Sequence, residues 1–382
     1  MTTFPNLFRL FLYSLVFSLA IFLRPGLAHE NAPTVIDLRV AGTDVTITIR
    51  ANLEALLSGT AQHEESGTGE RPEDEVYNAL RQLNSDELVI RFSGFEPRFR
   101  EGLTLQLGEA NVPLTLEGIV AGATGDTDFA RDGSTVTYSA TLPNPDGQLA
   151  WQYDESYGDT VLRLFLDDKT EPTLADFVSA GAKADVALGD VKPKSAWQTF
   201  LDYIFVGFDH IVPKGLDHIL FVVGLFLLAA RVRPLLWQVT MFTLAHTITL
   251  ALGAVGWVNL PGNIVEPIIA ASIAYVAIEN LFTDKLYPWR PALIFGFGLL
   301  HGLGFASVLG DFGLPDGQFI PALIGFNIGV EVGQIAVIAA CFLAVGWFRD
   351  KPWYHRMIVT PASLAIAVIA LYWVVERTGL IA

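Results

Sequence analysis

Two Asp-His pairs near the middle of the chain, Asp209-His210 and Asp217-His218, flank a Pro-Lys-Gly turn at residues 213–215. Imidazole nitrogen and carboxylate oxygen are ligands that divalent transition metals accept. The second pair opens a long apolar run, so these ligands would stand at the entrance of a hydrophobic segment. The spacing therefore predicts cation chemistry where a soluble region meets a membrane region.

More polar residues follow inside the apolar runs. An acidic side chain at the centre of a lipid-facing helix costs about 2.5–3.5 kcal/mol, so these groups must face the interior of a helical bundle, pair with one another or line water. They form a series of oxygen and nitrogen ligands without a thiolate, because the one cysteine, Cys341, lies alone inside an apolar run. Such a set suits Ni²⁺, Co²⁺, Zn²⁺ or Cu²⁺. The series comprises Asp217, His218, His246, Glu266, Glu279, Asn280, His301, Asn327, Glu331 and Gln334.

The depth of each polar group follows from the helical rise of about 1.5 Å per residue. His246, His301 and Glu331 are expected near the midplane, whereas Asp217, His218 and Glu266 belong to the outer third and Glu279 and Asn280 to the inner third. We predict that the metal ligands are Asp217, His218, His246, His301 and Glu331. Path or supporting positions are predicted at His210, Glu266, Glu279, Asn280, Asn327 and Gln334. The alternative is that the histidines are satisfied by threonine hydroxyls and backbone and only join helices.

The elements that must position these residues are about six apolar spans, each near the ~20 residues that cross a bilayer. They are predicted at 215–231, 235–257, 263–282, 291–310, 319–347 and 358–375. If the segment before them is exported, basic residues fall in the inner loops, as the positive-inside rule requires. These are Arg231, Arg233, Lys285, Arg290, Arg349, Lys351 and Arg356, and the outer loops 258–262 and 311–318 contain none.

Residues 1–28 have the pattern of a secretory signal, with Arg9, an apolar stretch to Leu23 and small residues at 26–28. An uncleaved anchor is the alternative. Cleavage after Ala28 would leave His29 as the amino terminus, where an amine and an imidazole could chelate copper, although a terminal histidine commonly has no such role.

Residues 29–169 are predicted to form an exported all-β, sandwich-like domain. Strand patterns occur at 33–52, 87–92, 103–107, 112–119, 135–142 and 161–166, with a helix from Pro72 to about Leu83 and a mobile loop at 58–71. A linker at 170–196 and a short interfacial helix at 197–208 lead to the membrane part, 197–382. All of the net charge of −16 falls on residues 29–195, which makes nucleic acid an improbable partner.

The stretch 207–221, Gly-Phe-Asp-His-Ile-Val-Pro-Lys-Gly-Leu-Asp-His-Ile-Leu-Phe, resembles the signature of the HupE/UreJ family of membrane proteins, in the larger type with an exported N-terminal domain. Further similar stretches surround His246, Glu266, His301 and Glu331, so the resemblance covers about 197–377. It implies a secondary permease for a divalent metal, usually nickel. The shorter nickel permeases carry His-Pro-x-x-Gly-x-Asp-His. Asp217-His218 match this motif well, whereas His210 lies five residues before Gly215 rather than four.

Three functions remain open. The first is a permease for nickel or cobalt in an inner membrane of bacterial type, with the N-terminal domain and the C-terminus outside. The second is an intramembrane zinc hydrolase built from the histidines, Asp217 and Ser272 or Ser307. The third is a non-catalytic accessory protein that presents the β-domain and whose protein partners the sequence does not identify. We expect the first, because the polar groups recur from the outer mouth to the inner end, and the ion could be nickel, cobalt or zinc.

Overall fold

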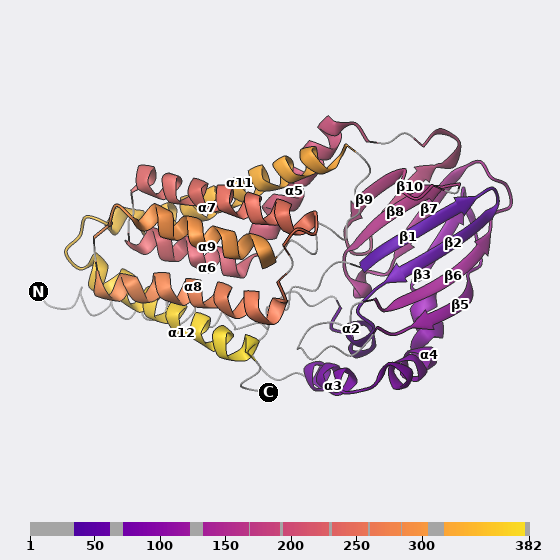
Figure 1. Cartoon of the computed structure of the whole chain (residues 1–382), viewed down its shortest axis with the longest axis horizontal. Helices are drawn as coiled ribbons and strands as arrows, with labels where there is room; N and C mark the ends of the chain where they lie inside the picture. Colours follow the sequence, from indigo (N-terminus) through magenta and orange to yellow (C-terminus); the bar gives the residue numbers. More distant parts are fainter. Residues whose placement is uncertain are drawn as a thin grey trace, which may run out of the picture.

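The computed structural model describes residues 34–61, 72–122, 133–167, 169–191, 194–228, 231–258, 260–283, 285–304 and 317–378. A β-rich part and a helical bundle follow each other along the long axis of the molecule (Figure 1). The predicted signal at 1–28, His29 and most of the predicted loops 58–71 and 311–318 lie outside the described residues.

The β-rich part contains two sheets. The six-stranded sheet has the order β5-β6-β2-β1-β8-β9 and the four-stranded sheet the order β10-β7-β3-β4. Strand β1 pairs in parallel with β8, and the other strand pairs in the described part of the chain are antiparallel. The strands are β1 (Thr34–Ala41), β2 (Asp44–Arg50), β3 (Leu103–Leu107), β4 (Ala110–Asn111), β5 (Thr115–Val120), β6 (Thr135–Thr141), β7 (Gln148–Tyr153), β8 (Thr160–Leu166), β9 (Leu174–Val178) and β10 (Lys183–Ala187).

The alternating pattern of β2 explains how the sheets form a core. Val45, Ile47 and Ile49 are buried, while the residues between them are more exposed, as a period of two requires. Side chains from both sheets and from helices α2 (Leu53–Ser58) and α4 (Ser85–Glu101) share one hydrophobic cluster. The prediction of a β-rich N-terminal domain is confirmed, and so is the helix after Pro72, which is α3 (Pro72–Arg81).

Helix α4 corrects one detail of the predicted β-rich domain, the strand expected at 87–92. Asn84 caps this helix, and its side chain and that of Glu87 exchange hydrogen bonds with each other's backbone N–H. Leu88, Phe92 and Phe99 are buried at helical spacing. The capping box and the helical period outweigh the strand propensity of a short apolar run.

The region predicted to be a linker, 170–196, contributes to both sheets. Strand β9 extends the larger sheet beside β8, and β10 extends the smaller sheet beside β7. The sheet-forming region therefore reaches Ala187. Because a polar, alanine-rich composition gives little periodic signal, the sequence does not distinguish edge strands from a linker here.

The helical part consists of α5 (Ala196–Ile211), α6 (Leu216–Leu228), α7 (Val232–Ala254), α8 (Gly262–Phe282), α9 (Arg290–Gly304), α11 (Phe319–Val345) and α12 (Thr360–Arg377). Among the described residues, four segments are long and apolar enough to cross a membrane: 232–254, 264–282, 319–348 and 355–377. The pair α5 and α6, bent by 72°, makes a fifth if it is one span. The predicted polytopic bundle is confirmed; within the described residues α6 and α9 comprise 13 and 15 residues.

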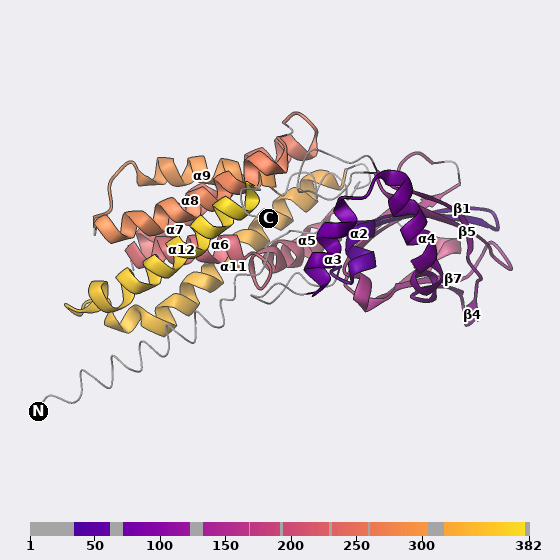
Figure 2. The same ribbon diagram turned by 90° about the horizontal axis from the view of Figure 1, so that it is seen from below.

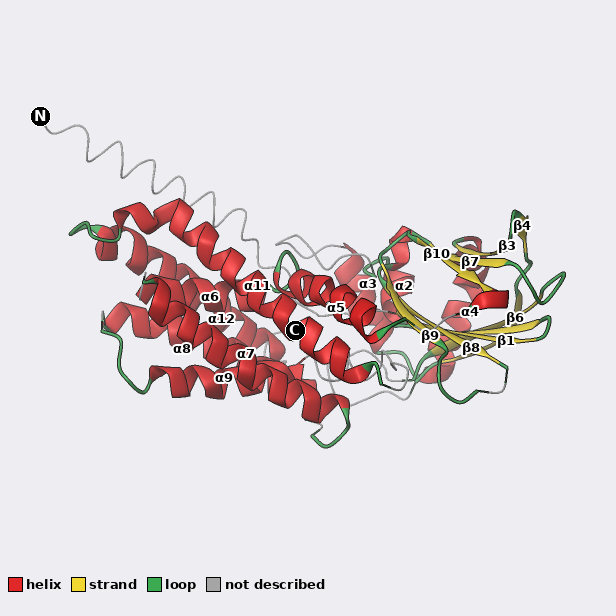
Figure 3. Ribbon diagram, turned by 90° about the horizontal axis from the view of Figure 1, so that it is seen from above, coloured by secondary structure: helices red, strands yellow, loops and turns green. Residues whose placement is uncertain are grey.

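Glycines allow the helices to approach closely. A Cβ on Gly298 or Gly302 of α9 would overlap the backbone carbonyl of Phe242 or His246 on α7, and Gly325 and Gly329 of α11 meet α5 in the same way. Figures 2 and 3 show these neighbours from below and above, with α11 beside α5 and α12 beside α8. Close packing through small residues is typical of membrane helices.

Candidate metal centre

The break between α5 and α6 brings two histidines together. His210 lies in the last turn of α5 and His218 in the first turn of α6, and their ring centroids are 4.9 Å apart. Residues 212–215 separate the helices, and a Cβ on Gly215 would overlap the carbonyl of His210. The tight turn therefore requires glycine and places both imidazoles in the bundle interior.

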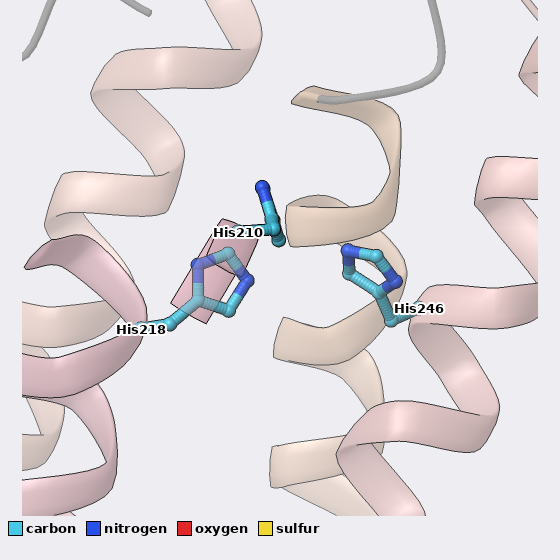
Figure 4. Close-up of side chains that lie close together, drawn as sticks. All are labelled: His210, His218 and His246. Carbon is cyan, nitrogen blue, oxygen red and sulfur yellow. The ribbon is translucent and has the colours of Figure 1, made fainter. Parts of the chain in front are cut away.

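His246 of α7 completes a group of three imidazoles. One ring nitrogen from each of His210, His218 and His246 lies within 4.8 Å of the others, and all three residues are buried. Figure 4 shows the rings around a common space, each from a different helix. Three nitrogens on one tetrahedral ion would lie about 3.4 Å apart, given metal–nitrogen bonds of ~2.1 Å. Shifts of each nitrogen by under an ångström would therefore suffice to bind a metal.

Asn327 of α11 fixes which nitrogen of His246 carries the proton. The Asn327 Nδ2 group donates to the Leu323 carbonyl at 2.8 Å, so Oδ1 is the atom that faces His246 Nδ1 at 3.2 Å. A carbonyl oxygen only accepts, so Nδ1 is protonated and Nε2 carries the lone pair. Among the described residues, His246 Nε2 is buried without a hydrogen-bond partner. This arrangement is how proteins orient a metal-binding histidine.

His301 of α9 lies next to this group. Its ring centroid is 5.1 Å from that of His218, but it is not part of the group of three. Ser272 of α8 donates its one hydroxyl proton to the Ile269 carbonyl at 2.7 Å, so His301 Nε2, 3.0 Å from the hydroxyl oxygen, is the donor in that contact. His301 Nδ1 then carries a lone pair, buried and unpaired within the described part of the chain.

Aromatic side chains enclose the imidazoles. Phe242 lies 4.9 Å from His301 and 5.7 Å from His218, Phe221 lies 5.3 Å from His301 and Phe326 lies 5.3 Å from His210, measured between ring centroids. This wall excludes water from the imidazole nitrogens. Exclusion of water strengthens the attraction between a lone pair and a cation.

Asp217, predicted as a ligand, points to a different partner. Its carboxylate accepts from Arg377 Nη1 at 2.8 Å and Nη2 at 3.3 Å. Arg377 also contacts the backbone carbonyl of Glu266 at 3.4 Å. Asp217 and Glu266, which were expected at the same outer depth, thus both contact this arginine. His218, predicted with them, lies with the histidines.

Glu331 and Gln334, on α11, also lie beside α7 but outside the imidazole group. Glu331 accepts a hydrogen bond from Thr240 at 2.7 Å, and Gln334 accepts one from Thr243 at 3.1 Å. Both therefore tie α11 to α7, Glu331 at Thr240 and Gln334 at Thr243. The structure brings Asn327, rather than Glu331, into contact with His246.

Glu279 and Asn280, at the end of α8, have partners away from the histidines. Glu279 forms a 2.8 Å ion pair with Arg290, whose Nε donates to Gln238 at 3.1 Å. Asn280 donates to the Gly224 carbonyl at 2.8 Å and to Ser363 at 3.2 Å. These contacts join α8 to four other helices. A path from the histidines to this end of the bundle would lead past a closed ion pair.

The group of three contains His210, which the family motif matched least well, and omits Asp217, Glu331 and His301. The geometry offers a small set of neutral nitrogen ligands to a borderline transition metal. Sequence reasoning missed Arg377 as the partner of Asp217. The position of this basic residue at the end of the last span could have indicated the pair, because charges within membranes pair with one another.

A family model described as HupE / UreJ protein matches residues 188–377, which includes α5 to α12 and every histidine above. The comparisons with curated proteins and with solved structures give no match.

Proposed function

We propose that this chain is a membrane permease for a divalent transition metal, nickel or cobalt, because its residues 188–377 belong to the HupE/UreJ family. The family is generally linked to the transport of these two ions. The observation that carries the proposal is the convergence of His210, His218 and His246, from three helices, on one buried space. The cation is the cargo, which these imidazoles take from water and release again.

Neutral nitrogen ligands suit transport. Three imidazoles leave at least one coordination position open on a four-coordinate ion, so another ligand can enter before the first three leave. Thiolates are absent from the group of three, and the chain's one cysteine, Cys341, lies on α11. Nickel and cobalt accept imidazole readily, and a site without thiolate can exchange its ion.

The orientation in the membrane is part of the proposal. The β-rich part would lie outside an inner membrane of bacterial type, after removal of a signal peptide. The last turn of α12 lies at the end of the bundle that faces the sheets (Figure 1), which supports a C-terminus on the same side. The connections at the opposite end contain Arg231, Arg349 and Lys351, as the positive-inside rule requires of a cytoplasmic side.

Uptake and binding of metal test the function together. Cells that make the protein should accumulate Ni²⁺ or Co²⁺, and the purified protein in detergent should bind Co²⁺, with the absorption bands of nitrogen ligation. His218→Ala and His246→Ala should abolish both. His355→Ala is the matched control, since His355 is an exposed histidine of the same bundle. Wild-type uptake and Co²⁺ binding in the His218 and His246 variants, at equal expression, would refute the proposal.

The hydrolase alternative is supported by the contact between Ser272 and His301. A serine nucleophile requires a histidine that accepts its proton. Here the Ser272 hydroxyl donates to Ile269 and accepts from His301, so the histidine does not activate it. We therefore favour transport. Loss of a hydrolytic activity in Ser272→Ala with metal uptake intact would reverse this preference.

A further inference from the structure

A lysine bridge joins the β-rich part to the helix break at the histidines. Lys214 lies in the break, and its Nζ is 2.6 Å from Asp159 Oδ2 and 3.0 Å from Asp209 Oδ2. Asp159 precedes β8, whereas Asp209 belongs to α5. One ammonium group therefore connects the sheet to both the break and the helix before it.

Asp159 is itself held firmly within the β-rich part. Its Oδ1 accepts from the Ala180 N–H at 2.8 Å, and its backbone carbonyl accepts from the Thr34 N–H at 3.1 Å. The carboxylate is thus fixed relative to β1, β8 and the turn after β9. Its second oxygen remains directed at Lys214.

Apolar contacts surround this bridge. Val35 of β1 and Val161 of β8 are buried in the hydrophobic cluster of the bundle, and Phe177 of β9 packs against it. Lys214 Nζ also lies 5.8 Å from the centre of the Phe177 ring. The end of the larger sheet is therefore docked on the bundle where the break lies, rather than linked to it only through the chain.

The position of Lys214 connects this docking to the imidazoles. It lies four residues after His210 and four before His218, in the segment whose geometry sets the 72° bend between α5 and α6. A shift of that segment changes the separation of the two imidazoles. A metal site tolerates only small changes, because its bond lengths are defined to about 0.2 Å.

We propose that the β-rich part is a positioning element of the metal centre, in which Asp159 holds Lys214 and thereby sets the separation of His210 and His218. The inference rests on the proposed metal site and assigns to the β-rich part a role in ion affinity. Asp159 and Lys214 act through the histidines and do not touch the ion.

The chain contains a matched control. Lys194 bridges the same two parts, with 2.7 Å contacts to Asp176 of β9 and to Asp202 of α5. Burial lowers the pKa of Lys194, but the two carboxylates outweigh this effect and the net pKa is raised. Lys194 precedes α5, so the whole of that helix, about four turns, separates it from the break. Its removal weakens docking without altering the turn between the histidines.

The test compares Co²⁺ affinity in the full-length purified protein. Lys214→Met and Asp159→Asn should bind Co²⁺ about tenfold more weakly or worse, the range seen when partners of metal ligands are removed. Lys214→Arg, which keeps the charge and reaches both carboxylates, should restore most of the affinity. Lys194→Met should bind as the wild type does. In uptake assays, Lys214→Met should raise the KM more than it lowers the maximal rate.

Two results would overturn the inference. One is an equal effect of Lys214→Met and Lys194→Met on Co²⁺ affinity, which would mean that both bridges only dock the two parts. The other is wild-type affinity in Lys214→Met and Asp159→Asn. His218→Ala separates these outcomes from failure of the transport proposal: if it binds Co²⁺ normally, the metal site itself is refuted.

Discussion

Arg377, in the last turn of α12, donates from two nitrogens to the carboxylate of Asp217, in the first turn of α6. The arginine side chain is 7% exposed and the aspartate side chain 18%. Both oxygens of Asp217 are thereby engaged, one residue before a histidine of the metal group. Asp217 neutralises a buried cation and fixes the start of α6, and through α6 it supports His218.

Single substitutions in this pair should destabilise the protein. Arg377→Met or Asp217→Asn leaves one buried charge without its partner, which costs about 3–5 kcal/mol. The double variant Asp217→Asn/Arg377→Met removes both charges, so we expect its thermal unfolding in detergent to be close to that of the wild type.

Metal binding distinguishes support from ligation. The double variant should retain Co²⁺ binding, because its three imidazoles are intact. If the double variant is stable but loses Co²⁺ as completely as His218→Ala does, Asp217 is a ligand, as the sequence predicted.

The β-rich part shows what periodicity can predict. Alternation predicted most of the strands, and Pro72 with its acidic neighbours predicted α3. Strands β7, β9 and β10 were missed, and α4 was mistaken for a strand because the apolar run from Leu88 to Phe92 fits either period. Only the cap at Asn84 and the continuation to Phe99 identify a helix, so a longer window was needed.

The candidate metal centre shows a different limit. Residue type and burial in apolar runs predicted that the histidines would face the interior. Depth along each span placed His218 apart from His246, but their ring centroids lie 5.9 Å apart in the structure. Which residue pairs with Asp217 depends on how the helices pack against one another. The sequence of one helix does not predict that Arg377 of α12 is the partner.

Alanine substitutions on α9 should show how closely the helices must pack. A Cβ on Gly302 would overlap the His246 carbonyl and the Thr249 hydroxyl. Gly302→Ala should therefore displace α7, cost about 1–3 kcal/mol and weaken Co²⁺ binding through His246. Thermal unfolding and Co²⁺ titration measure the two effects.

Gly296 gives the control on the same helix. Nothing lies within 4 Å of a Cβ built at Gly296, and alanine favours a helix over glycine by about 1 kcal/mol. Gly296→Ala should therefore be neutral or slightly stabilising. Similar losses at both positions would indicate that α9 tolerates no substitution and that the close approach at Gly302 has no special importance.

Cysteine labelling can test the proposed orientation. In a Cys341→Ser background, Glu109→Cys places a thiol on the exposed turn between β3 and β4, and Lys351→Cys places one in the exposed connection between α11 and α12. A membrane-impermeant maleimide should label the first in intact spheroplasts and the second only after lysis. The reverse pattern would place the β-rich part in the cytoplasm and contradict the predicted signal peptide.

Asn327 should control metal affinity through the tautomer of His246. Asn327→Leu removes the oxygen that accepts the hydrogen bond from Nδ1–H of His246. The proton can then move to Nε2, which would no longer offer its lone pair to the metal. Loss of such a partner costs about 10–100-fold in metal affinity, and Co²⁺ titration of the purified variant measures it. Asn327→Asp keeps an acceptor at the same place and should retain binding.

Gln334→Leu is the matched control for Asn327→Leu. Gln334 is a buried amide on the same helix, and its oxygen accepts from Thr243 rather than from an imidazole. Both leucine variants lose one buried hydrogen bond between α11 and α7, so their thermal unfolding should fall by similar amounts. Only Asn327→Leu should weaken Co²⁺ binding. If both variants lose the same affinity, the role of Asn327 is to pack α11 against α7, and His246 does not depend on it for its tautomer.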